Sequence, residues 1–306
     1  MPASPAGNGP ARNPVEDRRL ALFRETPLEI AQRVALGTAW ALRPRRAGKL
    51  LPLAQLWLAD LIAGKGKLPG HDALKETSEF AGMVHDLSVA TLLAAYARGL
   101  FPHGHFGPLK WTSPVERCVL FFDEFHVSTR LRSIMRQGKH EVTFDRDFEG
   151  VIKACAGRRE GRRWHLTWIT PRMMRAYARL YDEGHAHSFE VWNKSGALIG
   201  GGYGVALGRT FVIESQFFRE SNASKIGFSV LAWHLAKWGF LLCDNKWQTP
   251  TTAQMGFRLI PRAQFHQHLA VSAEGAGRRG RWEAETGPES VAGWRVGTPE
   301  GADVRV

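Results

Sequence analysis

The hydrophobic and polar positions follow a helical period in some segments of the chain and a strand period in others. The helical pattern predicts helices at residues 29–42, 52–62, 88–98, 126–135, 147–156, 171–181 and 223–238. Short apolar runs bounded by turn residues predict strands at residues 188–192, 197–206, 210–215 and 240–243. This mixture predicts an α/β or α+β fold with an antiparallel meander and a later crossover strand.

Residues typical of helix ends support several of these bounds. Ser88 is suited to cap the helix that Gly99 ends. Pro171 opens another helix at its first position, and Gly184 follows the end of that helix. Gly239 ends the helix that begins at about residue 223.

Composition shifts along the chain predict an extension at residues 1–84, a central part at residues 85–270 and a last part at residues 271–306. The extension has a disordered Pro- and Gly-rich lead and two helices separated by a basic segment. The second of these helices has lysines at its ends and is a candidate to lie on a membrane or on RNA, although ordinary docking on the main body is favoured. The last part is Gly-rich and polar, which predicts a loose tail.

The charge balance favours a polyanionic partner. The chain has 306 residues, and 41 Lys and Arg against 29 Asp and Glu produce a formal net charge of +12. Nucleic acid is the first partner of this kind and an anionic membrane surface the second. The apolar stretch at residues 50–63 is too short to cross a bilayer, and no secretion signal is recognised at the N-terminus.

The cysteine usage indicates a reducing compartment. Cys118, Cys155 and Cys243 lack the CxxC spacing of a metal site, and three cysteines do not form a disulfide framework. We therefore expect buried core cysteines in a cytoplasmic protein.

Nine short motifs follow one another in a specific order. They are YARGLFP at 96–102, WTSP at 111–114, TWITP at 167–171, HAHSFEVW at 185–192, GVALG at 204–208, ES at 214–215, NASK at 222–225, MG at 255–256 and IPR at 260–262. In this order and spacing the segment from about residue 85 to 270 resembles the leucyl/phenylalanyl-tRNA–protein transferase family. The extension lies outside the resemblance.

The resemblance implies an enzyme that transfers Leu or Phe from aminoacyl-tRNA to the N-terminal amine of proteins that begin with Arg or Lys, which marks them for degradation. It also implies a C-terminal acetyltransferase-like (GNAT-like) domain at residues 156–270 with a smaller N-terminal α+β domain at residues 85–155. The expected partners are aminoacyl-tRNA and acceptor proteins or peptides, and neither a metal nor an organic cofactor is expected.

Two acids are candidates for the chemistry of such a site. Glu214 lies in an apolar strand and Asp244 follows another apolar run, where an unpaired buried carboxylate would cost several kcal/mol. A carboxylate that pairs with an internal arginine or caps a loop is the alternative for each. By resemblance, Glu214 and Asp244 match the two active-site acids of the family.

Lys246 stands where the family has a Gln that handles the attacking amine. A protonated lysine donates to a carbonyl oxygen but cannot accept a hydrogen bond from an amine, and it repels an Arg- or Lys-headed peptide. Lys246 could instead pair with Asp244. The proton of the amine is then handled by Asp244 and the substrate itself, or by a changed acceptor group.

The expected aminoacyl pocket also departs from the family. Trp168 and Phe211 match aromatic positions of the family, while His103 replaces a Trp, Gly202 replaces a Met, Gln216 replaces an apolar residue and Leu231 replaces a Phe. Ordinary core packing is the alternative for the aromatic residues. The substitutions predict a reshaped and more polar pocket, so that the preference for Leu or Phe stays open.

Basic residues are candidates to bind tRNA phosphates. They are Arg130, Arg132, Arg136 and Lys139, then Arg158, Arg159, Arg162 and Arg163, and finally Asn222 and Lys225 at a helix N-terminus. A solvated charged surface is the alternative.

Two other functions stay open. A tRNA- or RNA-binding relative that has lost the chemistry is compatible with Lys246, His103 and Gly202. An acyl-CoA N-acyltransferase would share the fold, but residues 219–225 lack the glycines that its pyrophosphate loop requires.

Overall fold

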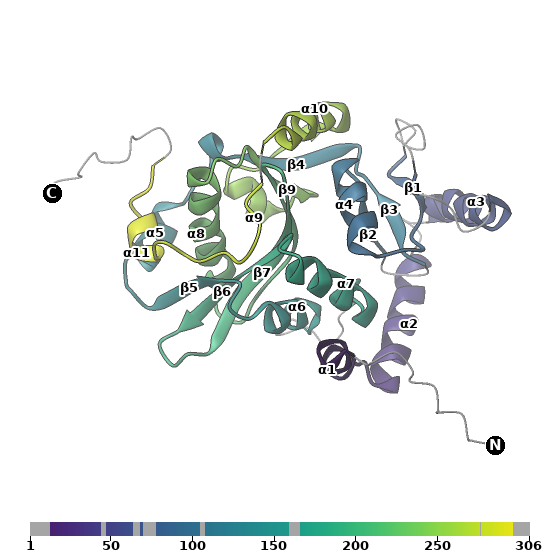
Figure 1. Ribbon diagram of the computed structural model, residues 1–306, viewed down its shortest axis with the longest axis horizontal. Coiled ribbons are helices and arrows are strands. Elements are labelled where there is room, and N and C mark those ends of the chain that lie inside the picture. Colours follow the sequence, from purple (N-terminus) through teal and green to yellow (C-terminus); the bar gives the residue numbers. More distant parts are fainter. Residues whose placement is uncertain are drawn as a thin grey trace, which may run out of the picture.

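The computed structural model describes residues 13–43, 47–63, 68–69, 78–104, 108–158, 166–275 and 277–295. Two β-sheets organise these residues (Figure 1). The small sheet has the order β1-β3-β2, with β1 Phe80–Met83, β2 Phe101–His103 and β3 Lys110–Thr112. The large sheet has the order β10-β4-β9-β8-β7-β6-β5. Its strands are β4 Glu116–Phe121, β5 His140–Phe144, β6 Ala186–Asn193, β7 Leu198–Leu207, β8 Thr210–Phe218, β9 Leu242–Lys246 and β10 Arg258–Pro261.

Helices cover both faces of the large sheet. The helices are α1 Pro14–Leu22, α2 Pro27–Ala41, α3 Ala47–Ala63, α4 Val89–Ala97, α5 Thr129–Met135, α6 Phe148–Ala156, α7 Pro171–Asp182, α8 Ala223–Lys237, α9 Pro250–Gln254, α10 Arg262–Ala273 and α11 Pro288–Val291, with a 3-10 turn at Phe122–Glu124. One hydrophobic cluster joins α8, α5 and α11 to one face, and a second joins α4, α6 and α7 to the other. Figure 1 shows α8 and α6–α7 on opposite sides of the sheet.

The large sheet changes from antiparallel to parallel pairing at its centre. Strands β5 to β8 form an antiparallel meander, and α8 then carries the chain to β9, which pairs in parallel with β8. A parallel neighbour requires such a crossover helix. The parallel register runs from Thr210 opposite Leu242 to Val212 opposite Asp244. The other edge of β9 pairs antiparallel with β4.

A β-bulge interrupts β8. Ser215 pairs with Tyr203 and Ile213 pairs with Gly204, so Glu214 is the extra residue on β8. Such a residue bends the strand and redirects the side chain. Glu214 therefore leaves the simple alternation of faces along the strand.

The helices expected from periodicity are present, with shifts of a few residues at their ends. Ser88 and Thr170 accept capping hydrogen bonds from backbone N–H groups, and Pro171 is the first residue of α7. Gly184 and Gly239 follow helix ends with φ of +72° and +77°, which glycine adopts without a steric penalty.

The expected division of the chain was wrong in two places. Strands β4 and β5 belong to the same sheet as β6 to β9, so the boundary at 155/156 does not separate two folded units. The tail from residue 271 is not loose within residues 277–295, because Trp282 is 1% exposed in the core and α11 packs on α8. Large aromatic side chains in this Gly-rich segment supply the apolar surface that attaches it to the sheet domain.

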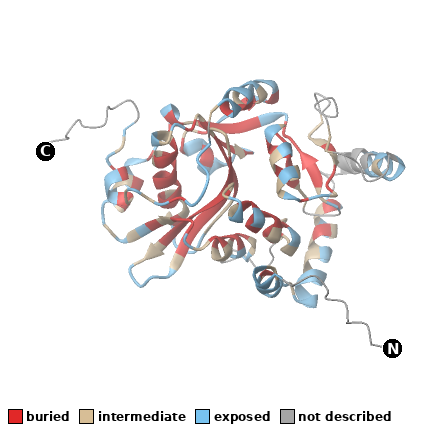
Figure 2. Ribbon diagram, in the orientation of Figure 1, coloured by how far each residue is buried: buried red, intermediate tan, exposed pale blue. Residues whose placement is uncertain are grey.

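The extension contacts the rest of the chain through α1, through Asp60 of α3, which pairs with His85, and through β1, which pairs with β3 in the small sheet. Arg19 pairs with Glu149 of α6 and Asp182 of α7, and Phe23 is buried in the cluster that also contains α4 and α7. The expected disordered lead, residues 1–14, lies outside the described residues except for its last two positions. Figure 2 shows that α3 is largely exposed where it is described, in contrast to the buried strands.

Candidate active site

Glu214 is the centre of a buried polar network. Its Oε1 accepts a hydrogen bond of 2.7 Å from the hydroxyl of Tyr96 on α4, and its Oε2 accepts one of 2.7 Å from Tyr177 on α7. Burial, together with the charge of Glu214, raises the pKa of each tyrosine well above the ordinary value of a tyrosine. Both hydroxyls therefore stay protonated and donate to the carboxylate.

The side chain of Lys246 extends from β9 to β8, just beyond the last residue pair of the parallel register. Its Nζ lies 2.7 Å from Glu214 Oε1 and also donates to the carbonyl oxygen of Ile213. Its backbone has φ of +66°, and its N–H donates to Asp244 Oδ1 at 2.8 Å. A lysine rarely adopts this left-handed conformation, so these contacts hold it there. Burial lowers the pKa of Lys246, while Glu214 opposes that effect.

Asp244 forms a fully buried ion pair with Arg117 of β4. Arg117 Nε and Nη2 donate to the two carboxylate oxygens at 2.8 and 2.7 Å, and the side chains of Arg117 and Asp244 are 1% and 0% exposed. Arg117 also donates to the carbonyl oxygen of Gly99 and lies over the rings of Phe101 and Phe265. The interpretation of Asp244 as a carboxylate paired with an internal arginine is thus correct. Its pairing with the Lys246 side chain is wrong, since that side chain reaches Glu214.

Four aromatic rings form one cluster, in which Phe101 contacts the lysine side chain. His103 lies 5.5 Å from Trp168 and 5.0 Å from Trp247, measured between ring centroids. Phe101 lies 5.2 Å from Trp247, and Lys246 Nζ is 5.0 Å from the Phe101 centroid. The sequence-predicted residues His103 and Trp168 therefore belong to one cluster with the lysine.

The other predicted pocket residues lie toward α8. Phe211 and Leu231 are buried in the cluster on that face, whereas Tyr177 belongs to the opposite face. A Cβ built on Gly202 would come within 2.8 Å of Phe189, which is in the same cluster as Phe211, and within 2.7 Å of Gln216. The parallel pairing of β8 and β9 ends at Val212 and Asp244. Their contact with an aminoacyl group stays a prediction.

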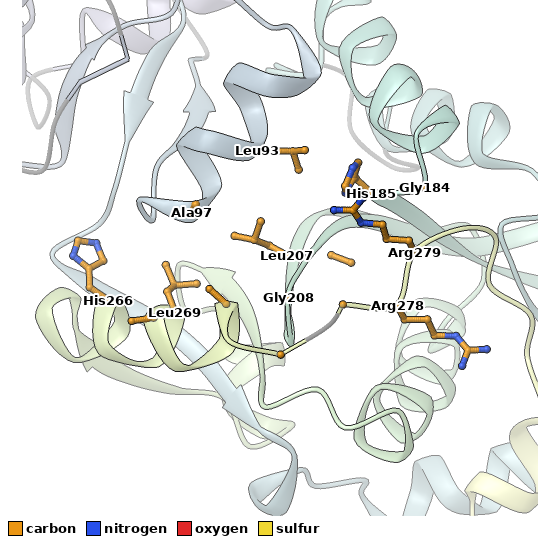
Figure 3. Close-up of a pocket in the computed structure, with 15 residues that line it drawn as sticks. Leu93, Ala97, Gly184, His185, Leu207, Gly208, His266, Leu269, Arg278 and Arg279 are labelled. Atoms are coloured by element: carbon orange, nitrogen blue, oxygen red, sulfur yellow. The ribbon is translucent and has the colours of Figure 1, made fainter.

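A separate cavity of about 670 Å³ opens between α4, α10 and the β7–β8 turn (Figure 3). Leu93, Ala97, Leu207 and Leu269 supply apolar walls, and the exposed Arg279 lies near the rim. Among the described residues that line it, none is a site residue predicted from sequence.

Of the basic residues on and after α5, Arg132 has a structural role. Its guanidinium donates to the backbone carbonyl oxygens of Ala292 and Trp294, which attaches the C-terminal segment. Burial lowers its pKa. The other three predicted residues are exposed: Arg130, Arg136 and Lys139.

The second basic cluster is described only in part. Arg158 is exposed after α6, which packs on the face of the sheet opposite α5. The predicted Arg159, Arg162 and Arg163 lie outside the described residues. Asn222 occupies the N-cap position of α8 in a left-handed conformation with φ of +67° and without a side-chain capping hydrogen bond, and Lys225 lies half-buried in the first turn of α8.

Sequence reasoning missed five residues of this site: Arg117, Tyr96, Tyr177, Phe101 and Trp247. A usable signal existed for Arg117, because a lone arginine precedes the apolar run Cys118-Val119-Leu120 and has to find a counter-charge if buried. The three cysteines are buried, as expected. Within the described ranges, no group of three His, Cys, Asp or Glu residues could hold a metal ion, and no helix is long and apolar enough to span a membrane.

Comparisons with known proteins converge on one family. The model of the leucyl/phenylalanyl-tRNA protein transferase matches residues 119–270, and the model of its N-terminal domain matches residues 85–115. The leucyl/phenylalanyl-tRNA–protein transferase of Pseudomonas syringae pv. syringae is 45% identical over 203 residues, which cover 66% of this chain and 87% of the relative. The transferase of Stutzerimonas stutzeri is 47% identical over 207 residues, which cover 66% and 89%.

Among solved structures, that of L-PGS from Bacillus licheniformis matches 66% of this chain and 65% of its own, with a TM-score of 0.30 and 11% identity. A score this low carries no argument about the fold. This chain covers most of the length of the two sequence relatives, and identities of 45% and 47% over that length show common descent. The chain belongs to the leucyl/phenylalanyl-tRNA–protein transferase family.

Proposed function

We propose that the chain transfers an amino acid from aminoacyl-tRNA to the N-terminal α-amine of a protein or peptide. Its relatives are named for transfer from leucyl- and phenylalanyl-tRNA to protein. The observation that carries the proposal for this chain is the Lys246–Glu214 pair at the point where β8 and β9 stop pairing. There a buried ammonium is held by fixed partners and adjoins an aromatic cluster.

In the proposed reaction, the acceptor amine attacks the ester carbonyl carbon of the aminoacyl-tRNA. The new C–N bond forms, the C–O bond to the ribose breaks, and the amine proton passes to the departing ribose oxygen. Lys246 in its ammonium form donates to the carbonyl oxygen as negative charge develops on it, and Glu214 holds the ammonium in place. A fixed donor of this kind is worth about 10²–10³ in rate.

Asp244 is proposed as a positioning residue. Both of its oxygens accept hydrogen bonds from Arg117, and Oδ1 also accepts the backbone N–H of Lys246. These contacts and its complete burial argue that it shapes the Lys246 turn and does not receive the proton of the amine. Direct transfer of that proton to the ribose oxygen fits this arrangement.

The aromatic cluster of Phe101, His103, Trp168 and Trp247 is proposed to bind the aminoacyl side chain. Apolar walls with few polar groups suit a Leu- or Phe-like side chain. The residues toward α8, Phe211, Gly202, Gln216 and Leu231, are proposed to line the deeper end of the aminoacyl pocket. The exposed Arg130, Arg136, Lys139 and Arg158, together with Asn222, Lys225, Arg159, Arg162 and Arg163, stay candidates for tRNA.

The acceptor is proposed to differ from the Arg- or Lys-headed proteins expected from the family. Each acid of the site already has a cation, because Lys246 pairs with Glu214 and Arg117 pairs with Asp244. The site therefore offers a cationic side chain no net attraction, and the Lys246 ammonium repels it. Peptides with a neutral or acidic first residue are expected to be the better acceptors.

A GNAT-like core is also part of the proposal. An antiparallel meander followed by a helix and a parallel strand, with pairing that stops after three residues, supports it. Transferred residues at protein N-termini would then act as degradation signals, in keeping with the family resemblance.

The proposal is tested with labelled aminoacyl-tRNAs and a set of peptides that differ only in their first residue. We expect transfer by the intact chain and a loss of about a hundredfold or more in Glu214→Gln, because Lys246 loses its counter-charge. Glu190→Gln, which changes a buried acid of the same sheet outside the site, is the matched control and should retain activity per folded molecule.

Other outcomes would replace the proposal. Binding of charged tRNA without transfer to any peptide would identify a non-catalytic RNA-binding relative, and transfer only from acyl-CoA would identify an N-acyltransferase. For the acceptor, Lys246→Gln should increase the use of Arg- and Lys-headed peptides relative to neutral ones. An unchanged ratio would show that Lys246 does not set acceptor preference.

A further inference from the structure

Helix α3 of the extension presents five large apolar side chains outward among those that the structure describes. Leu51, Leu58, Leu61 and Ile62 recur at helical spacing, and with Trp57 they are 52–79% exposed. We call these five residues the α3 apolar face. A surface helix normally turns such side chains toward the core, so contiguous exposure of this kind marks an interaction surface.

The opposite side of α3 confirms this orientation. Asp60, the single acid of the helix, lies 2.8 Å from Nε2 of His85 in the family domain, and α3 contacts β1. The charged residue therefore faces the protein and the apolar residues face away from it. This arrangement leaves the α3 apolar face available to a partner while the helix remains seated on the domain.

Charge complementarity identifies the partner. Between residues 43 and 67 the sequence has six Lys or Arg and one acid, Asp60, whose carboxylate is engaged by His85. Of the basic residues, Arg43 is described and exposed, and Lys49 lies in the first turn of α3. Two copies of this surface would bring like charges together. An apolar face flanked by basic residues fits an anionic lipid surface.

We propose that α3 lies in the interface of an anionic membrane and holds the domain at that surface. The helix does not span the bilayer, since no described helix is long and apolar enough to do so. Leu, Ile and Trp side chains enter the boundary between headgroups and acyl chains, and the basic residues remain at the phosphates. This proposal does not depend on the transfer reaction.

The test uses the full chain and sedimentation with phosphatidylcholine vesicles, with and without phosphatidylglycerol. We expect binding at least about tenfold tighter when the anionic lipid is present. The double variant Leu58→Glu with Ile62→Glu should weaken that binding by about tenfold or more. The matched control, Phe218→Glu with Val271→Glu, places the same charges at exposed apolar positions on β8 and α10 and should bind as the unchanged chain does.

A second measurement locates the contact. Brominated lipids should quench fluorescence in the unchanged chain more than in Trp57→Phe, since the difference reports Trp57 alone. Thermal unfolding checks that every variant is folded. Equal binding to neutral and anionic vesicles, or equal loss in the α3 variant and the control, would overturn the proposal. A dimer that the α3 variant converts to a monomer, without vesicle binding by the unchanged chain, would also overturn it in favour of a second copy.

Discussion

Ion pairs serve different purposes in the sheet and in the extension. At β8 and β9, Arg117–Asp244 and Lys246–Glu214 have side chains at most 4% exposed. Where α1 meets α6 and α7, Arg18 is 62% exposed while the neighbouring Arg19 is 4% exposed. The ion pairs at β8 and β9 are thus shielded from water, whereas those of α1 are partly exposed to it.

The difference determines what each pair can do. A buried pair gains little net stability over an apolar substitute, but loss of one partner leaves a charge without compensation. Such pairs hold a particular geometry, here the left-handed turn at Lys246. An exposed pair contributes less and is screened by salt, so it attaches an element without fixing its interior. The extension is therefore expected to be the more separable region.

The largest effect is expected for Arg117→Ala. Removal of the guanidinium leaves Asp244 buried without a cation and should lower the free energy of unfolding by about 3–5 kcal/mol. Denaturant unfolding measures this loss. Arg258→Ala, which breaks the half-exposed pair with Glu124, is the control and should cost at most about 1 kcal/mol. Similar losses in the two variants would remove the distinction between buried and exposed pairs.

A buried acid with neutral partners sharpens the comparison. Burial raises the pKa of Glu190 to about 6 from 4.5. The folded state binds this proton more tightly than the unfolded state does. The stability that the carboxyl group contributes is therefore complete below pH 4.5 and is lost as the pH rises through about 6. Relative to Glu190→Gln, the unchanged chain should lose about 2 kcal/mol of unfolding free energy between pH 4.5 and pH 7. A difference that stays constant with pH would contradict this prediction.

The smallest effect separates two arginines on the same helix. Arg19→Ala removes a buried guanidinium that pairs with Glu149 and Asp182, and should cost about 1–2 kcal/mol, since Asp182 is half exposed. Arg18→Ala removes an exposed partner of the same Glu149 and should cost less than about 1 kcal/mol. Unfolding free energies and protease protection of α1 measure both. Equal values would mean that burial does not decide the strength of this attachment.

Local sequence predicted seven of the described helices, but it missed α1, α9, α10 and α11 and the strands β1 to β5 and β10. Caps such as Ser88 and Thr170 and stops such as Gly239 act within one turn, so their signals are complete in the sequence. Strands β2, β3 and β10 have three or four residues, and β10 pairs with β4, which is far away along the chain. Such short strands have too few residues to show a period of alternating apolar and polar positions. Their conformation depends on the strand with which they pair.

The site was predicted in part for the same reason. Glu214 and Asp244 stood out because a carboxylate is unusual in an apolar strand. Their cations could not be assigned, because Arg117 comes from β4 and the bulge at Glu214 decides which side chain Lys246 reaches. The tail was mispredicted because its Gly-rich composition concealed Trp282, which the sheet buries.

The sequence by itself determined the family, the helix ends, the two acids and the departure at Lys246, since each depends on residue identity and short-range order. Only the tertiary structure decided which cation neutralises which acid and that Tyr96 and Tyr177 complete the network. It also decided that α3 turns its apolar side chains outward. Burial and pairing are properties of segments brought together from distant parts of the chain, and no local pattern specifies them.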